Sequence, residues 1–88
     1  MLRITQVSQS NSEVVLKIEG RVEGSDVKLL EQELEKQFRE TRFIVLQIEG
    51  LRHIDREGLV VLKGWVGKIA FLGESIFVRA LLVAHGLV

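Results

Sequence analysis

The sequence predicts an α/β domain in which strands and helices follow in the order ββαβαβα. Three observations predict it: an alternating hairpin near the N-terminus, an amphipathic helix over residues 27–38 and an apolar strand at Phe43–Ile48. Strands joined through helices should lie parallel, and the hairpin should add an antiparallel strand, so we expect a mixed sheet. The length of 88 residues predicts one domain, residues 1–88.

The hairpin is predicted from residues 2–7 and 13–19, which flank the polar loop Ser8–Ser12. In its second arm, three apolar residues alternate with a second set, the pattern of a strand with one buried face. The first set is Val14, Leu16 and Ile18, and the second is Val15, Lys17 and Glu19. The stretch Gly20–Gly24 breaks this pattern. Ser25 then has a side chain suited to an N-cap, so we expect the first helix to begin there.

The first helix and the next strand have opposite burial patterns. The helix presents one apolar face, made of Val27, Leu30, Leu34 and Phe38. The strand Phe43–Ile48 is apolar on both faces except for Gln47, which is typical of a central strand covered from two sides.

Three further elements are predicted in the second half of the chain. A helix is expected over Arg56–Leu72, with Gly73 placed to end it. Ser75–Ala80 has the character of a strand, and Leu81–His85 that of a short closing helix stopped by Gly86.

Composition excludes several classes of function. Twelve basic and twelve acidic residues cancel and no basic block occurs, which argues against nucleic-acid binding. Without cysteine there is neither a disulfide framework nor a thiolate metal site. The N-terminus lacks the apolar core of a signal peptide, and the apolar runs are too short to cross a bilayer. We therefore expect a cytoplasmic protein with no direct membrane insertion.

The segment Val45–Leu59, VLQIEGLRHIDREGL, resembles the STAS domain family, the fold of anti-sigma-factor antagonists and of sulfate-transporter tails. The family pattern V-L-D-L-S-G-V-x-F-I-D-S-S-G-L fits without a gap, and Asp55, Gly58 and Leu59 fall on its Asp, Gly and Leu. The ending Leu81–Leu87 is similar to the family's terminal L-L-x-x-x-G-L. The resemblance covers nearly the whole chain and implies a STAS-like mixed sheet with interspersed helices.

Two residues of the loop depart from the family pattern. In switchable relatives, the resemblance implies, a kinase that is also the binding partner phosphorylates the serine after the aspartate. Arg56 occupies that position here, and Glu57 replaces the next serine. An arginine has no hydroxyl and stays cationic, so no phosphorylation is expected at Arg56. Asp55 is also expected to cap the following helix.

The charged loop has no enzyme-like constellation. His53, Asp55 and Glu57 could suggest acid–base chemistry, but no nucleophile accompanies them. His53 occupies the family's aromatic position, which favours a packed ring, and His85 is isolated. The scattered histidines and carboxylates have no metal-ligand spacing. The sequence thus predicts no enzyme, no metal site and no cofactor.

The predicted second helix carries two apolar faces. The face expected to join the core consists of Leu59, Leu62, Val66, Ile69 and Ala70. Val61, Trp65 and Leu72 lie on nearly the opposite side and are either covered by the C-terminal strand and helix or offered to a partner. The second alternative includes a homodimer through the Val61/Trp65/Leu72 face.

Together these features predict a non-catalytic protein-interaction module of the regulatory, anti-sigma-factor-antagonist type, active in bacterial transcription regulation. Its partner would be an anti-sigma-factor-like kinase. An alternative is a small cytoplasmic STAS subunit of an ABC-type lipid transport complex, docked on the ATPase subunit. The predicted partner-binding residues are Glu23, Ser25, Asp55, Arg56, Glu57, Val61 and Trp65.

Overall fold

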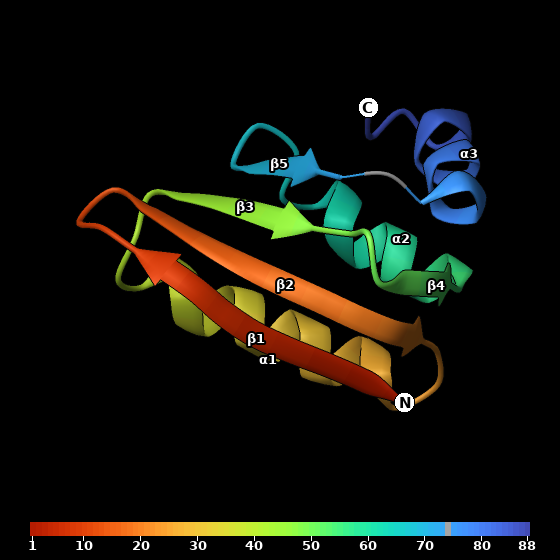
Figure 1. Cartoon of the computed structure of the whole chain (residues 1–88), viewed down its shortest axis with the longest axis horizontal. Helices are drawn as coiled ribbons and strands as arrows, with labels where there is room; N and C mark the ends of the chain where they lie inside the picture. The colour runs from red at the N-terminus through yellow and green to blue at the C-terminus, as the bar shows by residue number, and fades with distance from the viewer. Residues whose placement is uncertain (74) are drawn as a thin grey trace.

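A mixed five-stranded sheet organises the part of the chain that the computed structural model describes, residues 1–73 and 75–88 (Figure 1). The elements follow in the order β1 (Leu2–Gln9), β2 (Glu13–Val22), α1 (Asp26–Phe38), β3 (Phe43–Gln47), β4 (Leu51–Ile54), α2 (Arg56–Lys63), β5 (Ile69–Leu72) and α3 (Ile76–Ala84). The predicted α/β class is therefore confirmed, and the observed order adds one strand, β4, to the predicted series.

Strand β2 is the centre of the sheet. It pairs antiparallel with β1, and the pairing is irregular between Gln6 and Ser8. Its first half pairs parallel with β3 and its last residues pair parallel with β4. β5 adds to the far side of β3, also parallel. The expected parallel pairing of helix-linked strands, with one antiparallel hairpin strand, is confirmed.

The hydrophobic core lies between the sheet and the helices. In Figure 1, α1 runs behind β1 and β2, and it contacts β2, β3 and α2. The fully buried core residues are Val14, Leu16, Ile18, Val22, Leu30, Leu34, Ile44, Leu46, Ile48, Leu51, Ile54, Leu59, Leu62, Val78 and Leu82. Along β3 buried and half-buried residues alternate, so the strand is fully buried on one face only. The second face, which we also expected to be covered, is only half-buried.

The predicted long helix Arg56–Leu72 ends early. α2 stops at Lys63, and Gly67 has a φ of +93°, which the right-handed helix excludes. The residues beyond Gly67 form β5 instead, which pairs with β3. The apolar periodicity continued across the turn because β5 also faces the core.

The prediction for Ser75–Ala80 was also wrong, because these residues open helix α3. The buried residues Val78 and Leu82 are four apart, the spacing of one helix face, and the Ser75 hydroxyl donates to the Leu51 carbonyl oxygen at 2.7 Å. The predicted stop at Gly86 is consistent with its φ of +71°. None of the helices in the described residues has the length and apolar character needed to span a membrane.

Candidate protein-interaction surface

Asp55 connects two segments that are far apart in the sequence. It is the N-cap of α2, where its Oδ1 accepts a hydrogen bond from the Gly58 N–H at 3.1 Å. Its Oδ2 accepts another from the Gly24 N–H at 3.2 Å, in the turn before α1. The predicted capping role is confirmed, and the second bond holds the turn against the start of α2.

The sheet brings these two segments together. Val22 at the end of β2 and Ile54 at the end of β4 are paired neighbours, and the Asp55 N–H donates to the Val22 carbonyl oxygen at 2.9 Å. Both loops therefore leave the same edge of the sheet, at the carboxyl ends of parallel strands. In open α/β sheets this is the edge where functional loops gather.

Gly58 allows α2 to start close to the sheet. A Cβ on this residue would lie 2.7 Å from Ile54 Cγ1 and 3.0 Å from Val22 Cγ1, closer than carbon atoms can approach without displacement. A glycine is therefore needed here for a steric reason, which the sequence pattern alone did not reveal.

The gathered residues form what we call the loop surface, defined as Glu23, Ser25, Asp55, Arg56 and Glu57. Asp55 is half-buried, whereas the other four are exposed. Glu23 forms an ion pair with Arg21 at 3.5 Å, while Arg56 and Glu57 form no ion pair within the described residues. Ser25 is at the N-cap position of α1, but its side chain makes no capping hydrogen bond, so the predicted hydroxyl cap was wrong.

The remaining two predicted residues are part of the packing between helices. Val61 and Trp65 are half-buried against the core. The Trp65 ring stacks on Phe38 of α1, with centroids 4.4 Å apart and an interplanar angle of 12°. The Trp65 ring is therefore covered in part by helix α1, a neighbour that neither of the two predicted alternatives had named.

The predicted Val61/Trp65/Leu72 face does not exist as one surface. Leu72 is on β5 and alternates with Phe71, which packs on the core, so Leu72 points to the opposite side of the sheet from Val61 and Trp65. Val66, expected in the core, is 59% exposed because it follows the end of α2. The basis for a homodimer through that face is removed.

Solved structures share this arrangement. SpoIIAA in its unphosphorylated form matches with a TM-score of 0.79 and 19% identity, over 97% of this chain and 82% of SpoIIAA. An anti-sigma factor antagonist from Mycobacterium paratuberculosis matches with a TM-score of 0.83 and 14% identity, over 99% and 80%. An antisigma-factor antagonist STAS domain from Rhodobacter sphaeroides matches with a TM-score of 0.63 and 18% identity, over 82% and 86%. This chain has the STAS fold of these antagonists.

The STAS resemblance predicted from the sequence is thus confirmed for the fold. Bacillus SpoIIAA in its phosphorylated form also matches, with a TM-score of 0.70 and 17% identity over 97% of this chain and 85% of SpoIIAA. No protein-family model matches the sequence, and no curated protein matches it. At these identities the likeness establishes the fold alone.

One exposed residue beside the loop surface was missed by the sequence reasoning. Val60 is 62% exposed in α2, four residues after Arg56 and three after Glu57. These spacings place the three side chains on neighbouring positions of the helix surface. The sequence held a signal for it, because Val60 falls on neither the expected core face nor the Val61/Trp65/Leu72 face of the predicted helix.

The residues that might have suggested acid–base chemistry do not form a reactive group. Both carboxylate oxygens of Asp55 accept backbone hydrogen bonds. His53 is half-buried in β4, as the packed-ring prediction expected, and Glu57 is exposed. Within the described residues no group of three or more histidine, cysteine, aspartate or glutamate side chains could hold a metal ion.

Proposed function

We propose that this STAS-fold chain is a non-catalytic regulatory module that binds a protein partner through the loop surface and Val60. The observation that carries the proposal is the double hydrogen bonding of Asp55, which fixes two sequence-distant loops as one exposed edge. A pre-formed edge binds with a lower ordering cost than two mobile loops would.

The partner we propose is an anti-sigma-factor-like kinase in a bacterial cytoplasm, with transcription regulation as the outcome. The support is the fold, since the solved neighbours are described as anti-sigma factor antagonists. The edge also has the composition of an interface. Exposed Val60 supplies an apolar contact, and Arg56 and Glu57 supply charges that set orientation and specificity.

We further propose that binding is not switched by phosphorylation of this loop. Residues 55–59 contain no hydroxyl side chain, and the exposed Arg56 guanidinium remains charged throughout the physiological pH range. The module would then bind constitutively or respond to another signal.

Calorimetry with the purified anti-sigma-factor kinases of the source organism tests this function. The unmodified chain should bind one of them, and Arg56→Glu should weaken that binding at least about tenfold because the charge at the edge is reversed. Arg42→Glu is the matched control, since Arg42 is exposed and its backbone bonds to Ser12, at the opposite end of β2. Mass spectrometry after incubation with the kinase and ATP should find no phosphate on residues 55–59.

Each alternative outcome has a distinct meaning. Equal weakening by Arg56→Glu and Arg42→Glu would show that the loop surface is not the interface. A phosphate mapped to residues 55–59 would reject constitutive binding. Binding to the ATPase subunit of an ABC-type lipid transporter, in place of a kinase, would keep the interaction module and replace regulation by the transport-complex role.

A further inference from the structure

The sheet has a second face, on the side away from the helices. In Figure 1, α1 and α2 lie behind the strands, and no helix of the described chain lies in front of β1, β2 or β3. Side chains alternate between the two faces along a strand. The residues between the buried Val14 and Leu16 of β2, and between Ile44 and Leu46 of β3, therefore belong to this second face.

The middle of the second face is apolar on three neighbouring strands. We call this patch the open apolar face, defined as Val15 of β2, Phe43 and Val45 of β3, and Ala70 and Leu72 of β5. The strand register places Val15, Val45 and Ala70 in one row across the sheet. Leu72 is 53% exposed and the other four residues are half-buried. Contiguous apolar patches that meet solvent mark interaction sites.

Opposite charges flank the open apolar face on β2. Glu13 lies two residues before Val15 and Lys17 two residues after it, so all three side chains point to the same face. Both charged residues are exposed. Glu13 forms no ion pair within the described residues, and Lys17 is 3.9 Å from Glu19 in a solvent-exposed pair. An exposed pair of this kind is weak, so Lys17 can exchange it for a carboxylate of another molecule.

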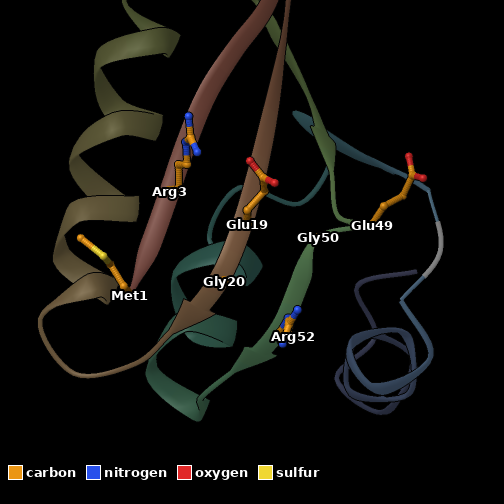
Figure 2. Close-up of a pocket in the computed structure, with 7 residues that line it drawn as sticks. All are labelled: Met1, Arg3, Glu19, Gly20, Glu49, Gly50 and Arg52. Atoms are coloured by element: carbon orange, nitrogen blue, oxygen red, sulfur yellow. The ribbon is translucent and has the colours of Figure 1, made fainter.

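Polar residues continue beyond both flanks. On the Lys17 side, Arg3 and Glu19 are cross-strand partners of β1 and β2 and lie side by side in Figure 2. On the Glu13 side, residues 10–12 form an exposed polar loop. The second face thus has an apolar centre between two polar ends, which is the usual composition of a protein–protein interface.

We propose that the open apolar face binds a second copy of this chain, face to face, with the strands of the two copies antiparallel. A two-fold axis that crosses β2 and β3 at Val15 and Val45 gives this arrangement. Each of these two valines then meets its own equivalent, and Lys17 of each copy faces Glu13 of the other. Sheets packed face to face lie about 10 Å apart, so side chains of the two copies interdigitate.

The charge pattern selects the antiparallel arrangement. If the strands were parallel and β2 lay over its equivalent, Lys17 would face Lys17 and Glu13 would face Glu13, and both contacts would be repulsive. With the strands antiparallel, both contacts join opposite charges. The surface is then complementary to itself, as a two-fold interface requires. It shares no residue with the loop surface, so this self-association goes beyond the proposed function.

Sedimentation equilibrium of the full chain tests the proposal. Three strands about 4.8 Å apart and five residues rising about 3.3 Å each give a footprint of roughly 15 Å by 15 Å. Interfaces at this small end of the range are weak and reversible, so the measurement covers chain concentrations of roughly 10 µM to 1 mM. A concentration-dependent monomer–dimer equilibrium is expected within this range.

Charge reversals locate the interface. Lys17→Glu and Glu13→Lys should each weaken dimerisation at least about tenfold, because each replaces both attractive contacts by like charges. The variant that combines the two reversals restores opposite charges across the axis and should recover most of the affinity. Glu35→Lys and Lys36→Glu are the matched controls, since both residues are exposed on α1, on the other side of the sheet. Each control should leave dimerisation unchanged.

Val45→Thr tests the apolar centre separately. It keeps the shape of the side chain and places a hydroxyl group of each copy at the axis, so dimerisation should weaken at least about tenfold while the circular dichroism spectrum stays unchanged. A chain that remains monomeric at about 1 mM would overturn the proposal. So would a dimer that is insensitive to these changes, a combined reversal that fails to recover affinity, or controls as disruptive as the Lys17 and Glu13 variants.

Discussion

Asp55 uses both carboxylate oxygens for backbone hydrogen bonds, one within α2 and one to the turn before α1. The serine at the start of α1 makes no comparable bond, although Ser25 is at the same N-cap position. The two residues therefore provide a natural comparison. Both are N-caps by position, but only the side chain of Asp55 accepts a hydrogen bond from a backbone N–H of the helix it begins.

We expect Asp55→Ala to lower the free energy of unfolding by about 1–2 kcal/mol, because the cap and the bond to Gly24 are both lost. Chemical denaturation monitored by circular dichroism measures this difference. The variant should also weaken partner binding, since the turn holding Glu23 is no longer tied to the loop.

Ser25→Ala is the matched control for this prediction. It removes a side chain that makes no capping bond, so the free energy of unfolding should stay within about 0.5 kcal/mol of the original value. Equal destabilisation by the two substitutions would show that the hydrogen bonds of Asp55 do not stabilise the fold.

Side-chain identity predicted part of this site. The spacing of Asp55 and Gly58 in the STAS-like segment predicted a capped loop after a strand, and the structure confirms it. Whether a serine caps a helix depends on the backbone conformation at the N-cap position, which the residue pattern does not determine. At Ser25 the backbone has φ −65° and ψ −17°, in the helical region instead of the extended one typical of an N-cap. The contact between Gly24 and Asp55 joins two segments that are far apart in the sequence, and no residue pattern predicted it.

Helices and strands in the second half of the chain show why sequence periodicity was insufficient there. α2 and β5 both direct apolar residues to the core, so the apolar pattern runs on through Gly64–Gly67. Glycine is unfavourable inside a helix, but short apolar segments do not distinguish a helix from a strand. β5 forms because β3 offers an open edge, which is a property of the assembled sheet.

Trp65 follows the end of α2 and packs against α1, so it has a structural role. Its ring is stacked on Phe38 and is half-buried, so Trp65→Ala should lower the free energy of unfolding by about 2–3 kcal/mol. Thermal and chemical denaturation measure this effect, and Trp65→Phe, which keeps an aromatic ring, should recover most of it. Unchanged stability with lost partner binding would instead show that the ring is an exposed contact.

A double-mutant cycle isolates the stacking contact from the general loss of apolar area. Phe38→Ala and Trp65→Ala should show a coupling energy of about 0.5–1.5 kcal/mol, because each substitution removes the same ring–ring interaction. Additive effects would mean that the two rings stabilise the fold independently, through different neighbours.

Strand pairing and side-chain packing are distributed unevenly along the chain. β2 pairs with β1, β3 and β4, and its inward residues Val14, Leu16 and Ile18 are fully buried. Helix α3 packs mainly on β4, anchored by Val78 and Leu82. Regions with few packed neighbours open at lower free energy than those at the centre of a sheet.

Native-state hydrogen exchange should reveal this difference as two steps of opening. Amide protons of β2 should exchange only through global unfolding, with a steep dependence on urea, because their bonds break when the sheet does. Those of α3 should have protection at least about tenfold lower and a shallow urea dependence, since the helix can detach while the sheet persists. The same protection and the same urea slope in both elements would instead show one cooperative unit, in which α3 is as integral to the STAS fold as its central strand.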